Sequence, residues 1–322
     1  MQRFTAAIFM LASLFLINCK NDEPVEPSDD ENHEPLTTEL RTFIFGHSLI
    51  VHDPPLIPTP SDETSVPHWM ASLANHANFD FAVAGQYGFL QQHDDLPPIA
   101  QWGFDIAEPA WDSDNESFAD ADFNTVLLTP ANFIQYQPSD ENYFNGDVSP
   151  VGATLTIHDW VKEQEPEITF YVYENWPDMA PFIGGQFPPT EEELAAYHEN
   201  TQGEFHEWWI DYHDHLVTAR PEDDIRMIPV GPIIGKILTE TELASIPFAE
   251  LYEDDAPHGR PTIYFLAGLI TYMAMYGTES PADYVIPNTV HELVSTHYQE
   301  VVSLIWEELN AFDFDNGESR VW

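Results

Sequence analysis

The chain has 322 residues, 43% of them hydrophobic, which is enough to bury one large core or two small ones. Nine Lys and Arg residues stand against 56 Asp and Glu residues, so the formal net charge is −47. This excess of acidic residues excludes a protein that binds the nucleic-acid phosphate backbone, because such a protein needs a basic surface. It also argues against attraction to an anionic membrane surface.

Residues 1–19 have the features of an export signal. Arg3 gives a positive start, and residues 6–17 form an apolar run too short to span a bilayer comfortably. The run ends in LINC, which resembles the lipobox of bacterial lipoproteins, with Asn18 in place of the usual small residue. The resemblance implies that Cys19, the sole cysteine, is lipidated and becomes the mature N-terminus. An ordinary signal peptide with an incidental thiol is the alternative.

Residues 20–37 are rich in Pro, Asp, Glu and Asn, a composition typical of a disordered tether. Acidic residues directly after a lipidated cysteine resemble the signal that carries some lipoproteins to the outer face of the outer membrane; a plain spacer is the alternative. We therefore expect an exported outer-membrane or cell-surface lipoprotein that meets the membrane only through its lipid. The folded domain is expected at 38–322.

Within that domain, β-branched and aromatic runs alternate with helical patterns. Buried strands are predicted at 42–45, 79–84, 124–129, 168–173 and 225–230. Helices are predicted at 67–77, 154–164, 191–217, 262–276 and 290–311, with long loops over 51–66 and 86–121. The alternation predicts an α/β fold: a three-layer sandwich whose central five-stranded parallel sheet has helices on both faces.

Ser48 follows the first predicted strand, after the break at Gly46. Such a serine lies at the carboxyl edge of the sheet, where open α/β folds bind ligands. Its hydroxyl is a weak nucleophile unless a base removes the proton. An ordinary strand-end turn with a solvated serine is the alternative.

A candidate base lies between the last predicted strand and the apolar helix at 262–276. Asp255 and His258 are three residues apart in a Pro-containing turn. At this spacing a carboxylate can accept a hydrogen bond from the N–H of one imidazole nitrogen. The other nitrogen is then free to act as a base. Chance supplies many such pairs in a chain with 56 acids and 14 histidines, so the pair gains weight from its position.

Four short blocks, taken in order, resemble the SGNH (GDSL-like) hydrolase superfamily, and most closely its rhamnogalacturonan acetylesterase-like branch. They are Gly46-His47-Ser48-Leu49, Ala82-Val83-Ala84-Gly85, Asn132, and Asp255-Ala256-Pro257-His258. The resemblance covers roughly residues 40–280. It implies a flavodoxin-like SGNH hydrolase fold.

The resemblance also implies roles for these residues. Ser48 would attack an ester carbonyl, His258 would serve as general base and then acid, and Asp255 would orient His258. The backbone N–H groups of Ser48 and Gly85 and the amide of Asn132 would form the oxyanion hole. Three positions depart from the family pattern: His47 replaces an acid, Pro130 a glycine and Phe133 an acid.

Other candidate sites are weaker. His206, His213 and His215 crowd one predicted helix, but the H-E-x-x-H zinc motif is absent, and a surface helix is the preferred interpretation. We expect no metal and no cofactor. Among the loop aromatics, Tyr87, Phe133 and Trp176 are candidates to line a substrate cleft, and Trp176 is favoured because it follows the fourth strand.

The sequence therefore predicts a monomeric serine esterase that removes acetyl or other short acyl groups from a carbohydrate, without nucleic-acid partners. A lipase-like or aryl esterase with the same residues is one alternative. A surface glycan-binding lipoprotein without catalysis is another.

Overall fold

The computed structural model describes residues 34–130, 137–143 and 146–322. The chain divides into two units, Met1–Glu34 and Pro35–Trp322, and the second carries the fold. Cys19, the predicted signal and nearly all of the predicted tether lie outside the described residues. Among the helices of the described ranges, none is long and apolar enough to cross a membrane.

The core of the second unit is a parallel sheet with the strand order β3-β2-β1-β4-β5-β6. The strands are β1 (Glu39–Gly46), β2 (Asp80–Tyr87), β3 (Glu108–Pro109), β4 (Thr125–Leu128), β5 (Thr169–Tyr173) and β6 (Ile225–Ile228). The predicted α/β class with a central parallel sheet is confirmed. A sixth strand joins the predicted five, because the two-residue β3 is too short to leave a sequence pattern. Without β3, the order is the flavodoxin-like 2-1-3-4-5.

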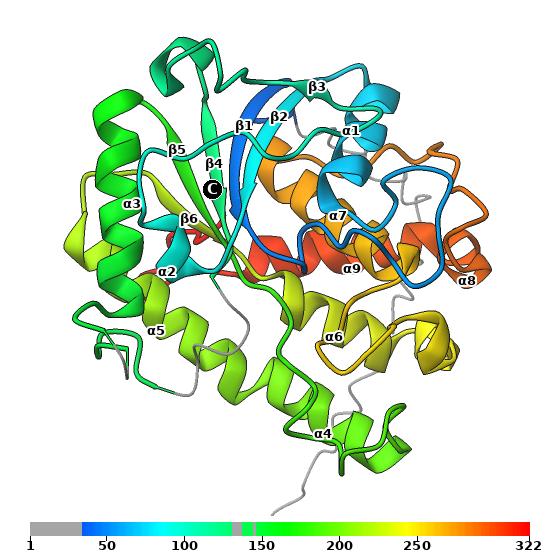
Figure 1. The fold of residues 1–322 in the computed structure, drawn as a ribbon. Helices are drawn as coiled ribbons and strands as arrows, with labels where there is room; N and C mark the ends of the chain where they lie inside the picture. Colours follow the sequence, from blue (N-terminus) through cyan, green and yellow to red (C-terminus); the bar gives the residue numbers. More distant parts are fainter. Residues whose placement is uncertain (1–33, 131–136, 144–145) are drawn as a thin grey trace, which may run out of the picture. The chain divides into compact units, whose positions relative to one another are not determined.

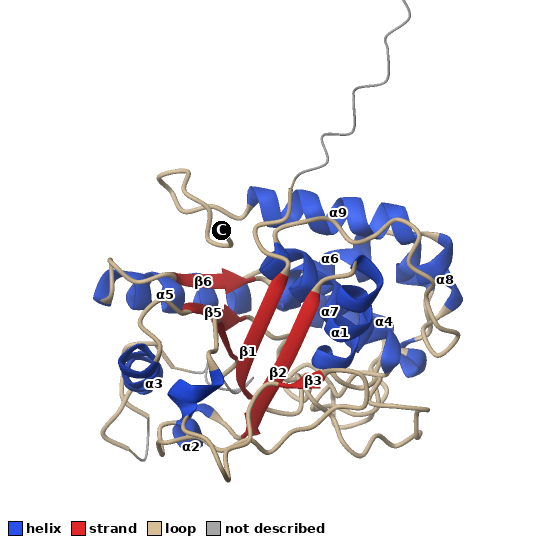
Figure 2. Cartoon of the chain, turned by 90° about the horizontal axis from the view of Figure 1, so that it is seen from above, coloured by secondary structure: helices blue, strands red, loops and turns tan. Residues whose placement is uncertain are grey.

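Helices cover both faces of this sheet, as Figures 1 and 2 show for α3 on one side and α1 and α7 on the other. Phe43 and Phe45 of β1 point to the core shared with α3 (Pro150–Gln164) and α5 (Glu204–Ala219). Ile44, between them, points to the opposite core. That core is shared with α1 (Val66–Ala77), α6 (Val230–Glu240), α7 (Pro261–Tyr276) and α9 (Tyr298–Ala311).

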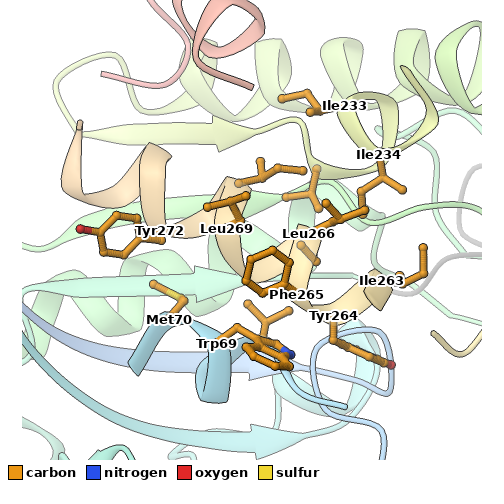
Figure 3. Packing of buried hydrophobic residues seen from close by; sticks show 14 of the residues in the cluster. Trp69, Met70, Ile233, Ile234, Ile263, Tyr264, Phe265, Leu266, Leu269 and Tyr272 are labelled. Atoms are coloured by element: carbon orange, nitrogen blue, oxygen red, sulfur yellow. The ribbon is translucent and has the colours of Figure 1, made fainter. Parts of the chain in front are cut away.

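Helix α7 is apolar around its whole circumference, which is typical of a helix enclosed on all sides. Every residue from Thr262 to Tyr276 is buried. Figure 3 shows its side chains between Trp69 and Met70 of α1 and Ile233 and Ile234 of α6. The helix therefore gives a rigid base to the turn that precedes it, which contains His258.

Two predicted helices are each divided in the structure. The helix expected at 191–217 separates into α4 (Glu191–Gln202) and α5 at Gly203, where a Cβ would lie 2.9 Å from the carbonyl oxygen of Glu199. The helix expected at 290–311 separates into α8 (Glu292–Thr296) and α9. Helix α6 was not predicted. Shorter elements are α2 (Leu90–His93) and the 3-10 helices η1 (Phe118–Ala121), η3 (Glu242–Ser245) and η4 (Phe248–Glu250).

After α9, the C-terminal segment 312–322 lies along the edge strand β6. The N–H of Met227 donates to the carbonyl oxygen of Arg320 at 2.8 Å. The Arg320 guanidinium lies 4.0 Å from the ring centroid of Phe314 and donates to Asp214 at 2.7 Å. The indole N–H of Trp322 donates to the carbonyl oxygen of Ala274 at 2.9 Å. The segment thus covers part of the β6 edge.

Candidate active site

The turn after β1 is held by a buried histidine. His47 Nε2 donates to the carbonyl oxygen of Pro130 at 2.5 Å, and Nδ1 accepts from the N–H of Leu49 at 3.3 Å. Burial lowers the pKa of His47 to about 4, against the opposing effect of the bond to Pro130. The ring is therefore neutral near pH 7, as one donor and one acceptor nitrogen require. In this chain a neutral histidine fixes the turn where the family resemblance leads one to expect an acid.

Ser48 is half-buried and anchored through its backbone. The hydroxyl of Tyr264, on α7, donates to the carbonyl oxygen of Ser48 at 2.5 Å. Within the described ranges, neither the N–H nor the Oγ of Ser48 makes a hydrogen bond.

Ser48 and His258 line the same cavity, which has a volume of about 1100 Å³. Its walls come mainly from the loop between β1 and α1 and from the segment around Trp102, between β2 and β3. Tyr87, a predicted cleft residue, is 48% exposed and also lines this cavity. The structure thus brings two distant residues, from the first strand end and from the turn before α7, to one cavity.

The carboxylate that contacts His258 is Asp254 and not the predicted Asp255. His258 Nδ1 lies 2.7 Å from Asp254 Oδ2, while the other carboxylate oxygen accepts from the N–H groups of Ala256 and His258, each at 3.1 Å. Asp255 is exposed, and its carbonyl oxygen accepts from the N–H of Met179. The turn folds back on the first of the two adjacent aspartates, so the carboxylate at His258 is Asp254 and not the predicted Asp255.

These contacts decide the protonation state of Asp254. Partial burial raises the pKa of its carboxyl, but hydrogen bonds from the His258 imidazole and from two backbone N–H groups outweigh this effect, and the net pKa is lowered. Asp254 is thus ionised at neutral pH. An ionised acceptor requires the proton on His258 Nδ1, which leaves Nε2 with a free lone pair.

Gly85 lies inside β2, paired with Ile44, and does not line the cavity. A Cβ at Gly85 would lie 2.4 Å from the Trp102 ring. Close packing therefore accounts for this glycine, and its placement does not support the predicted oxyanion role. Asn132 and Phe133 lie outside the described residues, so their roles stay predictions.

Trp176 is buried and does not line the cavity, so its predicted place in a substrate cleft is wrong. Its indole N–H donates to the carbonyl oxygen of Pro257 at 2.9 Å, and its ring meets that of Tyr264 edge-on at a centroid distance of 6.1 Å. Trp176 therefore packs beneath the turn 254–258 on its buried side and holds it through Pro257. An aromatic residue after a strand fits either place, and the sequence pattern does not separate them.

A second serine of the cavity wall, Ser61, contacts a histidine. Ser61 Oγ lies 3.4 Å from Nδ1 of His68, and Ser61 lines the cavity wall. Within the described part of the chain, no carboxylate hydrogen-bonds to His68, although the charges of Asp62 and Asp105 act on it. Ser61 and His68 thus form a second serine–histidine pair, and its histidine lacks the carboxylate contact that His258 has.

Sequence reasoning missed His52 and Glu253, which lie beside His258. The His52 and His258 rings are stacked, with centroids 4.1 Å apart and planes 9° apart. His52 Nε2 lies 3.2 Å from Glu253 Oε2. The adjacent acids at 253 and 254 were a signal for this cluster, since each of them contacts one of the two histidines.

Helix α5 has an exposed face, as expected of a surface helix, but His206 and His213 lie toward its inner side. His206 Nδ1 lies 2.9 Å from both carboxylate oxygens of Glu174, which is fully buried at the end of β5. His213 is buried between the carbonyl oxygen of Ile225 and the guanidinium of Arg320. His215 is near Asp211 and Ser139. Among the described residues, no group of three or more His, Cys, Asp or Glu side chains could hold a metal ion.

No protein-family model and no curated protein matches the chain. Among solved structures, the chain is similar to a DUF4886 family protein from Bacteroides uniformis, with a TM-score of 0.51, 11% identity, and coverage of 88% of this chain and 98% of that one. A family 3 carbohydrate esterase from Clostridium thermocellum gives a TM-score of 0.37 at 10% identity, covering 74% of this chain and 94% of its own. The lipase Lip_vut3 from a goat rumen metagenome gives 0.37 at 13% identity, covering 74% and 98%. Of the three, only the DUF4886 protein exceeds a TM-score of 0.5, and at 11% identity it concerns the fold alone.

Proposed function

We propose that the protein is a serine esterase in which Ser48 is the nucleophile, His258 the general base and Asp254 the residue that orients it. One observation carries the proposal: Ser48 shares a cavity with a histidine whose Nδ1 is held 2.7 Å from a carboxylate. The free Nε2 of such a histidine is the acceptor that a serine hydroxyl needs.

The chemistry proceeds through an acyl-enzyme. Ser48 Oγ bonds to the ester carbonyl carbon while His258 Nε2 takes the hydroxyl proton. The C–O bond to the alcohol then breaks, and His258 returns that proton to the leaving oxygen. His258 then takes a proton from water, whose oxygen bonds to the acyl carbon. The bond from that carbon to Ser48 Oγ breaks, the acid leaves, and His258 returns the proton to Oγ. The unbonded N–H of Ser48 is one candidate donor to the oxyanion, and Asn132 stays a predicted second donor.

An acylated carbohydrate is the substrate class we propose. The cavity is large enough for a sugar unit, and Tyr87, Trp102 and Phe104 give it flat aromatic surface beside polar side chains. Asp53, Asp62 and Asp178 also line it, so neutral glycans are favoured over uronic-acid or sulfated ones. A lipase-like esterase would prefer longer acyl groups, so a chain-length series of nitrophenyl esters separates the two.

The proposed location is the cell surface or outer membrane, with lipidated Cys19 as the anchor and a monomer as the working form. This proposal depends on the LINC segment and on the acidic residues that follow it. Cys19→Ala should move the protein from the membrane fraction to the soluble fraction of the expressing cell. Equal partition of both forms would count against the anchor.

The catalytic assignment is tested by acetate release from nitrophenyl acetate and from acetylated polysaccharides. Ser48→Ala and His258→Ala should each lower kcat by on the order of 10³-fold or more. Ser61→Ala, in the rival serine, should retain most of the activity. Loss of activity in Ser61→Ala with retention in Ser48→Ala would move the nucleophile to Ser61. Equal release by the wild type and Ser48→Ala, at the rate of the uncatalysed reaction, would favour a glycan-binding protein.

A further inference from the structure

A second histidine–carboxylate pair lies directly against the first. His52 Nε2 is 3.2 Å from Glu253 Oε2, and His258 Nδ1 is 2.7 Å from Asp254 Oδ2. The two carboxylates are neighbours in sequence, and the two imidazoles are stacked at 4.1 Å with nearly parallel planes. The proposed mechanism uses only the His258 pair.

The two contacts of His258 restrain different movements. The hydrogen bond to Asp254 holds one edge of the ring and still permits the ring to tilt about the Nδ1–Oδ2 line. A flat ring against its face blocks that tilt. The direction of Nε2, which must meet the serine hydroxyl, is therefore fixed by both neighbours together.

His52 is itself firmly held. The backbone N–H of His52 donates to the carbonyl oxygen of Thr64 at 2.9 Å, and Thr64 Oγ1 donates to the carbonyl oxygen of His52 at 2.7 Å. The Glu253 side chain is only 1% exposed; it accepts from the N–H of Leu56 at 2.8 Å and lies 3.7 Å from the Arg260 guanidinium. The N–H of Glu253 also donates to the carbonyl oxygen of His258 at 2.8 Å, which joins the second pair to the turn of the first.

We propose that His52 is a positioning residue that fixes the plane of the His258 imidazole, and so aims Nε2 at Ser48. The proposal rests on the esterase function above. His52 needs no contact with the substrate for this role.

The charges around the stack favour the same arrangement. Burial and the neighbouring His258 lower the pKa of His52, against the opposing effects of Glu253 and Asp254. Arg260 offsets the charge of Glu253 from the far side. His52 thus stays neutral when His258 takes the serine proton, and a cationic ring on a neutral aromatic ring is a favourable contact.

Two substitutions separate ring shape from other effects. His52→Ala removes the stacking surface, whereas His52→Phe keeps a flat ring and loses the hydrogen bond to Glu253. We expect His52→Ala to lower kcat on nitrophenyl acetate by about 10–100-fold with little change in KM, because a misplaced reacting group costs rate more than binding. His52→Phe should recover most of the lost rate. His76→Ala is the matched control. Like His52, His76 pairs with a carboxylate, since its Nε2 lies 3.0 Å from Asp283, but it does not line the cavity.

A second measurement does not depend on activity. Crystal structures of the wild type and the two variants report the plane of the His258 ring. In His52→Ala the ring should keep its hydrogen bond to Asp254 but depart from the wild-type plane, and in His52→Phe the wild-type plane should return. His258→Ala should raise the pKa of His52, because one lowering influence is removed.

The outcomes are distinct. Wild-type kcat and an unchanged plane of the His258 ring in His52→Ala would overturn the proposal. Equal rate losses in His52→Ala and His52→Phe would overturn it as well, because ring shape would then not be the property that matters. A wild type inactive on all esters, with a His258 ring plane that still depends on His52, would support the positioning contact and refute the esterase function.

Discussion

The hydroxyl of Tyr264 donates a hydrogen bond to the carbonyl oxygen of Ser48, which lies 216 residues earlier in the sequence. Helix α7, enclosed in the core, therefore holds the backbone of the serine turn. Tyr264→Phe keeps the ring and removes only this bond. We expect the free energy of unfolding to fall by about 1–3 kcal/mol, since a carbonyl oxygen loses its partner, and kcat to fall with KM nearly constant. Urea denaturation and steady-state kinetics measure the two effects; unchanged values in both would show that the bond contributes nothing.

Asp254 contacts His258 where the sequence predicted Asp255, so substitutions at these two positions form a paired test. Asp254→Asn should lower kcat by on the order of 10²–10⁴, because an amide no longer enforces the proton on His258 Nδ1. Asp255→Asn is the matched control; its carboxylate is exposed, and its carbonyl contact to Met179 survives. The reverse pattern would restore the assignment made from the sequence.

The packing of Gly85 against Trp102 is open to the same kind of test. Gly85→Ala places a methyl group 2.4 Å from the indole, and overpacking of this kind costs about 1–3 kcal/mol of unfolding free energy. Gly146→Ala is the control, since its Cβ would have its nearest neighbours at 3.9 Å. Thermal denaturation should show a clear loss for the first variant and little for the second. A Gly85→Ala protein with wild-type stability but little activity would instead favour the oxyanion role.

The buried pair of Glu174 and His206 makes stability depend on pH. Burial raises the pKa of Glu174 to about 7, against the opposing effect of His206. The pKa of His206 is lowered by burial but raised more by Glu174, so the net shift is upward. Both folded-state pKa values lie above the unfolded ones. The stability they contribute is therefore complete below about pH 4.5 for Glu174 and 6.5 for His206, and is lost as pH rises through the folded values.

The measurement is urea denaturation of the wild type and Glu174→Gln between pH 5 and 8. The wild type should lose more unfolding free energy over this range than the variant, which lacks the titrating carboxyl. All other acidic residues are common to both proteins, so the difference between the two pH curves reports on the Glu174–His206 pair. Parallel pH curves would contradict the assignment.

The layered fold was readable from the sequence because its signals are local. Each long strand is a short apolar run, and the uniformly apolar stretch that became α7 can only be a buried helix. Gly203 was the weak point, since a glycine within a helical pattern predicts neither continuation nor a break. Pro229 ends β6 directly before α6, and the mixed apolar run across that boundary read as strand alone.

The site was readable only in part, because its contacts depend on how a turn closes. Adjacent aspartates at 254 and 255 are equivalent in a pattern, and only the folded turn shows which one reaches the imidazole. Trp176 follows β5 and Tyr87 is the last residue of β2, yet Trp176 is enclosed in the core and Tyr87 lines the cavity. His52 has no motif at all; its position follows from the loop that returns through Thr64.

The C-terminal segment along β6 has a consequence for self-association. Arg320 supplies the carbonyl group that occupies an amide of the outermost strand, and Phe314 and Trp322 fasten the segment on either side. A protein trimmed after α9 would present bare peptide groups at the end of its sheet. Such a border accepts a strand from another molecule, so the trimmed chains would be prone to join edge to edge and precipitate.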